Sequence, residues 1–176
     1  MIIQQTELEG LLVVRPTRNA DQRGLFARLW CADTFASAGL RFQPRQISVS
    51  HNTVAGTLRG LHWQAAPHAE TKLVRASRGR VFDVAVDLRE DSPSFRSWYG
   101  MELDAESYTA LFIPPGFAHG FITLTDGAEL TYCIDVPYAP AAARGARFDD
   151  PALAIKWPYH PGLISERDLA WPPLRP

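Results

Sequence analysis

The chain has 176 residues, 46% of them hydrophobic, which is enough for one domain with a sizeable core. Its formal net charge is −1 and its charges form no blocks, so composition gives no indication of nucleic-acid binding or of a disordered tail. No segment has the length and apolarity of a membrane helix. The opening MIIQQTELEG also lacks the basic and apolar regions of a signal peptide.

The chain has two cysteines, Cys31 and Cys133, and no CxxC motif. A disulfide framework is therefore not expected, and a reducing cytoplasm is the favoured location. The sequence contains no internal repeat and no low-complexity linker. We expect a single domain over residues 1–176, with neither nucleic acid nor a membrane as a partner.

Short strands dominate the predicted elements. In chain order, strands are expected at residues 11–15 and 24–31, and then a short helix at 33–39 with Asp33 as N-cap and Gly39 as C-cap. Further strands follow at 46–52, 57–64, 71–77, 80–88, 97–103, 109–114, 120–125 and 128–135. From about residue 137 the composition indicates an irregular C-terminal tail.

Turn signals separate these strands, and Asp126-Gly127 between two apolar runs is the strongest hairpin signal among them. So many short strands at this spacing predict an all-β sandwich or barrel. The interior of such a barrel should be lined by apolar side chains, yet several predicted strands carry polar ones. These are Arg59, His62, Lys72, Asp83, His119 and Tyr132.

Buried polar groups are costly unless they are paired, so several on one barrel indicate a site. Each has a structural alternative. The alternative for Lys72 is a rim lysine with its amine in water, for Tyr132 a core tyrosine with a bonded hydroxyl, and for Asp83 a structural hydrogen-bond partner. The alternative for Arg59 is a plain surface ion pair, and the role of His119 is open between scaffold and ligand contact.

Ideal strand alternation puts Arg59 and His62 on opposite faces. If both side chains reach one cavity, the strand needs a bulge or kink at Gly60.

Two fragments match the cupin signature. Gly56 followed after five residues by His62 opens the first motif, and residues 114–119 give the P-x-G-x-x-H part of the second. Metal-binding cupins usually carry H-x-H in the first motif, whereas here Gln64 replaces the second histidine. A three-histidine site cannot form at the expected positions, so we expect a metal-free cupin, or jelly-roll, barrel.

Ordered matches along nearly the whole chain resemble the dTDP-4-dehydrorhamnose 3,5-epimerase family. They lie at residues 23–26, 56–62, 72–75, 81–87, 113–121, 138–140, 150–151, 155–158 and 165–168. The resemblance implies an isomerase that epimerises a nucleotide-diphosphate-linked 4-keto-6-deoxyhexose. No cofactor is implied, since electrons are conserved overall. A homodimer is also implied, in which the N-terminal strand adds to a partner sheet.

The chemistry of such a substrate explains the residue types. Hydrogens on C3 and C5 are acidic because the carbanion delocalises onto the C4 oxygen as an enolate. The resemblance makes His62 the base, Asp168 its orienting partner and Lys72 the cation at the C4 oxygen. Tyr132 matches the acid that returns a proton to the opposite face, with its pKa lowered by a nearby positive charge.

The resemblance also implies a set of substrate contacts. Arg59 is the leading diphosphate contact and Arg23 the second, either from the same chain or from a neighbouring subunit. Phe26 would pack on the base or sugar, and Tyr138 would contact the substrate. His119 and Gln46 complete the predicted binding set.

Two stretches depart from the family pattern. Arg28 stands where R-G-x-F-x-E ends in glutamate, and residues 46–50 replace a Q-D-N-type stretch. Both resemble base-recognition elements, so the nucleotide stays open, and so does epimerisation at C3 alone or at C5 alone. Alternatives of another class are a metal-dependent cupin enzyme and a non-enzymatic sugar-binding cupin.

Overall fold

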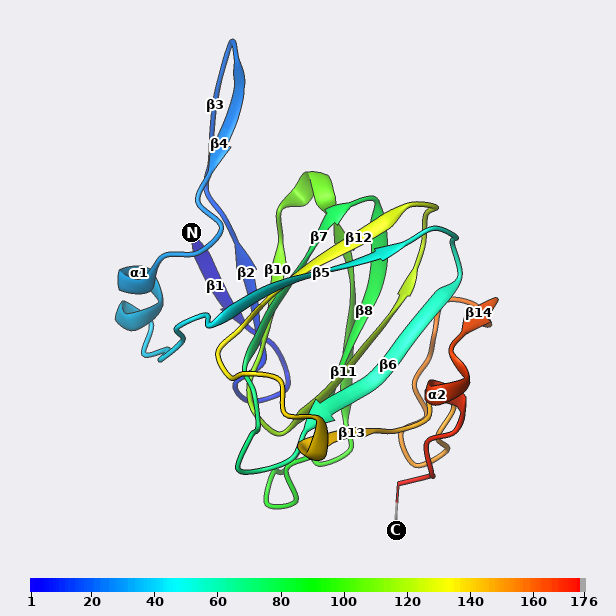
Figure 1. Cartoon of the computed structure of the whole chain (residues 1–176). Coiled ribbons are helices and arrows are strands. Elements are labelled where there is room, and N and C mark those ends of the chain that lie inside the picture. Colours follow the sequence, from blue (N-terminus) through cyan, green and yellow to red (C-terminus); the bar gives the residue numbers. More distant parts are fainter. Residues whose placement is uncertain (175–176) are drawn as a thin grey trace.

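The computed structural model, described here over residues 1–174, consists mainly of two antiparallel sheets (Figure 1). The first sheet has the order β1 (Ile2–Gln5), β2 (Leu12–Arg15), β10 (Ala110–Ile113), β7 (Lys72–Arg78), β12 (Ala128–Ile134) and β5 (Gln46–Asn52). The second has the order β13 (Ala143–Gly145), β6 (Thr57–Gln64), β11 (Phe117–Thr123), β8 (Arg80–Asp87) and β9 (Trp98–Asp104). The predicted all-β jelly-roll class is confirmed.

The remaining elements lie around this barrel. The hairpin of β3 (Arg18–Asp21) and β4 (Gly24–Ala27) projects away from it, and α1 (Ala32–Ser37) follows (Figure 1). Two 3₁₀ turns occupy Ala105–Ser107 and Pro140–Ala142. The short strand β14 (Leu163–Ile164) pairs parallel with β6, and α2 (Glu166–Leu169) comes directly after it. Neither described helix is long and apolar enough to cross a membrane.

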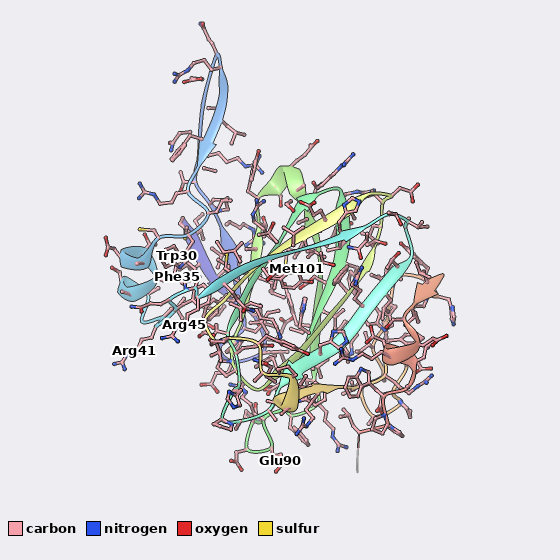
Figure 2. All side chains as sticks on the ribbon, viewed as in Figure 1. Trp30, Phe35, Arg41, Arg45, Glu90 and Met101 are labelled. Carbon is pink, nitrogen blue, oxygen red and sulfur yellow. The ribbon has the colours of Figure 1, made fainter. Side chains whose placement is uncertain are left out.

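Apolar clusters between and outside the two sheets hold the layers together. The central cluster joins side chains of both sheets, among them Val74, Leu111 and Phe121. A second cluster packs Phe35 of α1 against Phe112 on the first sheet, and Figure 2 shows Trp30 beside Phe35. A third covers the second sheet with residues of the C-terminal segment. Both sheets are therefore buried on two faces over much of their area, which accounts for the long apolar runs of the strands.

Most predicted strands exist, with ends that differ by a few residues. The helix prediction was wrong in its caps: α1 begins after Cys31, Asp33 lies in its first turn, and Ala38 is the C-cap. Gly39 follows that cap with φ of +77°, a left-handed conformation that glycine adopts without strain. The strand expected at 24–31 stops at Ala27, where the chain turns into the helix.

The hairpin prediction at Asp126-Gly127 was wrong. The preceding strand, β11, pairs with β6 and β8, whereas the following strand, β12, pairs with β5 and β7 in the other sheet. The turn therefore crosses between the sheets rather than joining neighbours. The irregular tail was also only partly right, because β13, β14 and α2 all lie within it. Strands β1 and β3 were not predicted.

The expected bulge at Gly60 is confirmed. On β11, His119 pairs with His62 and Phe121 pairs with Arg59. The paired positions are therefore three residues apart on β6 but two residues apart on β11. A Cβ on Gly60 would lie 2.7 Å from both the Gly120 Cα and the His119 carbonyl oxygen, and its φ is +112°. Glycine is therefore required where the strand turns both polar side chains to one side.

Candidate active site

One cleft of about 660 Å³ collects most of the predicted site residues. Its walls come from β5, β6, β7, β11 and β12, and α2 and β14 close one side. The predicted residues that line it are Arg59, His62, Lys72, His119, Tyr132, Tyr138 and Asp168. Residues from both sheets and from the C-terminal segment thus meet in a single cavity.

His62 and Asp168 form a close pair. The His62 Nε2 lies 2.6 Å from the Asp168 Oδ1, and the Asp168 Oδ2 accepts a hydrogen bond from the Gly60 backbone N–H at 3.2 Å. The Asp168 side chain is 5% exposed and that of His62 45% exposed. Burial alone would raise the pKa of Asp168, but the hydrogen bonds from His62 and Gly60 outweigh it, so the pKa lies below its ordinary value. The carboxylate is hidden and ionised, while the imidazole stays open to the cleft.

The start of α2 fixes Asp168. Ser165 is the N-cap, and its Oγ accepts a hydrogen bond from the Asp168 backbone N–H at 3.1 Å. This local cap holds the carboxylate in the first turn of α2, next to β6. A charge that the sequence would otherwise place on the solvated surface is therefore buried in the cleft.

Lys72 is paired with Glu70, a residue that the sequence analysis did not select. The Lys72 Nζ lies 2.6 Å from the Glu70 Oε1, and both side chains are about nine-tenths buried. The alternative of a rim lysine with its amine in water was therefore wrong. A signal for Glu70 was present in the sequence, because it lies two positions before Lys72 and residues i and i+2 of an extended chain share a face.

Tyr132 lies against His119. The two rings meet edge to face with centroids 5.8 Å apart, and the His119 Nε2 lies 2.8 Å from the buried Asp83 Oδ1. Burial and the negative charge of Asp83 raise the pKa of Tyr132, although Arg59 opposes them. The expected lowering of this pKa was wrong, and the phenol is protonated at neutral pH. The expectation that Asp83 is a structural partner agrees with its contact with His119.

Arg59 is held by Asn52 rather than by a surface ion pair. Its Nε donates to the Asn52 Oδ1 at 2.7 Å, and Asn52 is almost fully buried. The Arg59 Nη2 also donates a longer hydrogen bond, of 3.5 Å, to the His51 carbonyl oxygen, so the guanidinium is held from β5 while it lines the cleft wall. Asn52 was another residue that the sequence analysis missed.

The Gln64 side chain forms hydrogen bonds to backbone groups. Its Oε1 accepts from the Ala139 N–H at 2.6 Å, and its Nε2 donates to the His68 and Pro137 carbonyls. These bonds tie the segment that carries Tyr138 to the end of β6. In residues 1–174 no group of three or more His, Cys, Asp or Glu side chains is close enough to hold a metal ion.

Four residues of interest lie away from the cleft of the same chain. Arg23 is on the projecting hairpin, where its side chain is 90% exposed and pairs with Asp21. Phe26 is 65% exposed on that hairpin, and it shares a small separate cavity with Arg28. Gln46 is on β5, but the cleft wall uses residues 48–50 of that strand instead. The binding roles of Arg23, Phe26 and Gln46 stay predictions.

The arrangement suits proton transfer on a bound carbonyl compound. An open imidazole backed by a buried carboxylate can accept a proton, and a protonated phenol in the same cavity can return one. An ammonium group and a guanidinium supply positive charge for an oxyanion and for phosphate groups. None of these steps requires a change of oxidation state.

Comparisons with known proteins agree with this chemistry. The model of the family described as dTDP-4-dehydrorhamnose 3,5-epimerase matches residues 5–176. The chain belongs to this epimerase family. It is 41% identical over 170 residues to the dTDP-4-dehydrorhamnose 3,5-epimerase of Shigella flexneri, covering 96% of this chain and 93% of that protein. The predicted epimerase of a nucleotide-linked 4-keto sugar is confirmed as an isomerase of this kind.

Two further relatives differ in the reaction that their names give. The dTDP-4-dehydrorhamnose 3-epimerase of Streptomyces niveus is 39% identical and covers 96% of this chain and 81% of its own length. A crystal structure of the Bacillus anthracis 3,5-epimerase, with TDP and PPi bound, superposes with a TM-score of 0.95 at 36% identity. It covers 98% of this chain and 99% of that one. The family thus contains enzymes named for two carbons and for one.

Proposed function

We propose that this epimerase inverts a nucleotide-linked 4-keto-6-deoxyhexose through an enolate that forms between His62 and Tyr132. The proposal is carried by one observation: both side chains line the same cleft, together with Lys72. Inversion needs a base and an acid on opposite faces of the sugar ring. A binding protein would not need both groups in one cavity.

His62 is the proposed base. It removes the hydrogen next to the ketone, and the buried Asp168 stabilises the imidazolium that results. The electron pair moves onto the C4 oxygen, where the Lys72 ammonium stabilises the enolate. The expected lack of a cofactor is consistent with this step, since a proton is all that leaves the carbon.

Tyr132 is the proposed acid. Because burial raises its pKa, the phenol keeps its proton until the enolate carbon accepts it. The resulting phenolate is stabilised by Arg59, the cation that lowers the pKa of this tyrosine. The product carries a proton on the face opposite to the one that His62 attacked.

The substrate would lie with its diphosphate at Arg59 and its sugar near Tyr138 and His119. All three residues line the cleft, and a guanidinium is suited to binding phosphate oxygens. A thymidine nucleotide is our first candidate, because the Bacillus anthracis relative binds TDP. Arg28 stands where the family pattern has glutamate, so the nucleotide is tested rather than assumed.

Deuterium exchange tests these roles. Purified protein in heavy water is given dTDP-, CDP-, GDP- and UDP-linked 4-keto-6-deoxy sugars, and NMR follows deuterium at C3 and C5. H62A should abolish exchange, whereas the control H68A, on an exposed turn, should retain it. Exchange at C3 alone would assign the narrower reaction of the Streptomyces niveus relative. An unchanged exchange rate in H62A would refute the role of the imidazole.

We further propose a homodimer in which the β3–β4 hairpin reaches the cleft of the partner. Support comes from the exposed Phe26 and Arg23 on a hairpin that projects from the barrel (Figure 1). The edge strand β5 also exposes Ile47 and Val49, at 70% and 58%. Co-expressing H62A with an R23A/F26A variant should restore activity, because a mixed dimer keeps one complete site. Additive activities of the two inactive variants would refute this arrangement.

A cytoplasmic location is also proposed. Both cysteines are free thiols, as is usual in a reducing compartment. Cell fractionation tests this location.

A further inference from the structure

Two lysines occur among the 18 cationic residues of the chain, Lys72 and Lys156; all the others are arginines. Lys156 is exposed, whereas Lys72 is 8% exposed and lines the cleft. Burial disfavours the charged form of a lysine, yet a neutral amine could not stabilise an enolate as a cation does. The site therefore needs a feature that keeps the buried amine protonated.

Glu70 supplies that feature. Its Oε1 lies 2.6 Å from the Lys72 Nζ, the side chain is 9% exposed, and it lines the same cleft. This is the single ion pair that the structure gives to Nζ within residues 1–174. An ion pair of this length offsets the cost of burying the two charges.

The backbone holds the pair in register. Lys72 pairs with Ile113 on one side and with Ile134 on the other, so β7 is fixed between β10 and β12. Between the two charged residues, the Thr71 N–H donates to the Asp135 Oδ1 at 2.7 Å. Lys72 is therefore fixed at the start of β7, and Glu70 lies in the segment directly before that strand.

We propose that Glu70 is a positioning residue that keeps Lys72 charged and aims its ammonium at the reacting oxygen. This inference rests on the proposed role of Lys72 in the epimerase reaction. The remaining ionisable groups of the cleft come from other elements, and none of them replaces this contact. They are Arg59 and His62 on β6, His119 on β11, Tyr132 on β12, Tyr138 in the following segment, Arg144 on β13, and Arg167 and Asp168 on α2.

None of these groups can supply the negative charge that Glu70 places beside Lys72. Arg59, Arg144 and Arg167 add positive charge, and neither His62 nor His119 can supply a negative charge. The Asp168 carboxylate is already bonded to His62 and to the Gly60 N–H. Replacing Glu70 by glutamine keeps the size of the side chain and removes the countercharge.

The charge of Lys72 can be measured without substrate. Lysine labelled with ¹⁵N gives two Nζ resonances, and the exposed Lys156 serves as an internal reference. In E70Q the Lys72 Nζ should lose its proton at a pH lower by about one unit or more than in the wild type, while Lys156 should not change. An Nζ titration in E70Q that coincides with the wild type would overturn the proposal.

Kinetics give the second readout. In E70Q, kcat for deuterium exchange should fall about 10- to 100-fold near neutral pH, with KM changed by less than about threefold, because the ammonium is no longer held at the reacting oxygen. The matched control is E102Q, which breaks the half-exposed Glu102–Arg80 pair and should keep the wild-type rate. A loss carried by KM instead of kcat would overturn the positioning role.

A second variant, E70D, tests the proposal if E70Q does not fold. E70D keeps the charge and moves the carboxylate back by one methylene, so kcat should fall less than in E70Q and KM should not change. An unchanged kcat in E70D would overturn the proposal. If the wild type exchanges none of the 4-keto sugars, the proposed function fails while the Nζ titration still reports on the pair.

Discussion

Asp168→Asn tests whether the Asp168 carboxylate orients and stabilises His62, the proposed base. The variant removes a carboxylate charge from a side chain that is 5% exposed and lies 2.6 Å from the His62 Nε2. Its shape is conserved, so the Ser165 cap and the start of α2 should persist. The change therefore addresses the electrostatics of the imidazole and not the fold around it.

The expected magnitude follows from these contacts. A charge-assisted hydrogen bond to the imidazolium contributes about 1.5–3 kcal/mol in the transition state. The asparagine amide can also turn its N–H₂ toward the ring and favour the wrong tautomer, which adds a further penalty. We expect kcat/KM to fall about 10²- to 10³-fold, which corresponds to about 3–4 kcal/mol.

The assay is deuterium incorporation at C3 and C5, followed by NMR at saturating and at limiting substrate. The control is D149N, which breaks the exposed Asp149–Arg147 pair in the same C-terminal segment and should retain the wild-type rate. Circular dichroism checks that both variants fold. If D168N folds and keeps more than about a third of the wild-type kcat/KM, the orienting role of the carboxylate is refuted.

Three further predictions concern the acid, the bulge and a buried carboxylate. In Y132F, deuterium should still enter from the His62 side, while net inversion falls about 10²-fold. NMR measures the exchange and product analysis measures the inversion. Inversion at the wild-type rate would contradict the role of Tyr132 as the acid. G60A should lower the free energy of unfolding by about 2–5 kcal/mol in urea titration, since its Cβ meets backbone atoms at 2.7 Å; an unchanged midpoint would contradict the packing argument. Asp87 is fully buried and accepts five hydrogen bonds, from Arg89, Ser92 and Ser94; burial opposes them, but they hold its pKa below the usual range. A folded-state pKa below the unfolded one stabilises the protein above about pH 4 and loses that stabilisation as the pH falls toward the folded value. D87N should therefore cost about 2–4 kcal/mol at pH 7, with a gap to the wild type that narrows in acid, and a gap independent of pH would contradict this.

Much of the fold was visible in local patterns. Period-two alternation and β-branched runs located most strands of both sheets, and the two histidine motifs indicated a cupin barrel. Strand ends and helix caps were less certain, because a cap depends on where the backbone leaves its extended path. Asp33 looks like an N-cap by residue type, yet Cys31 holds that place.

The sequence predicted some residues of the site and missed others. His62, Lys72 and Tyr132 stood out because polar residues are rare in barrel strands. Glu70 and Asn52 were missed because polar residues are ordinary just before a strand, where Glu70 lies, and at the last position of one, where Asn52 lies. Asp168 was found through family resemblance alone, since its own segment reads as solvated charge.

The sequence by itself determined which segments are strands, which faces are apolar, and which residue types are available for acid–base chemistry. These properties are local, because alternation and turn chemistry act over a few neighbouring residues. Only the tertiary structure decided which strands pair. It sent the chain across Asp126-Gly127 into the other sheet, and it brought Asp168 to His62 across 106 positions. Such contacts depend on the packing of the two sheets and on burial of the C-terminal segment, and no window of the sequence contains that information.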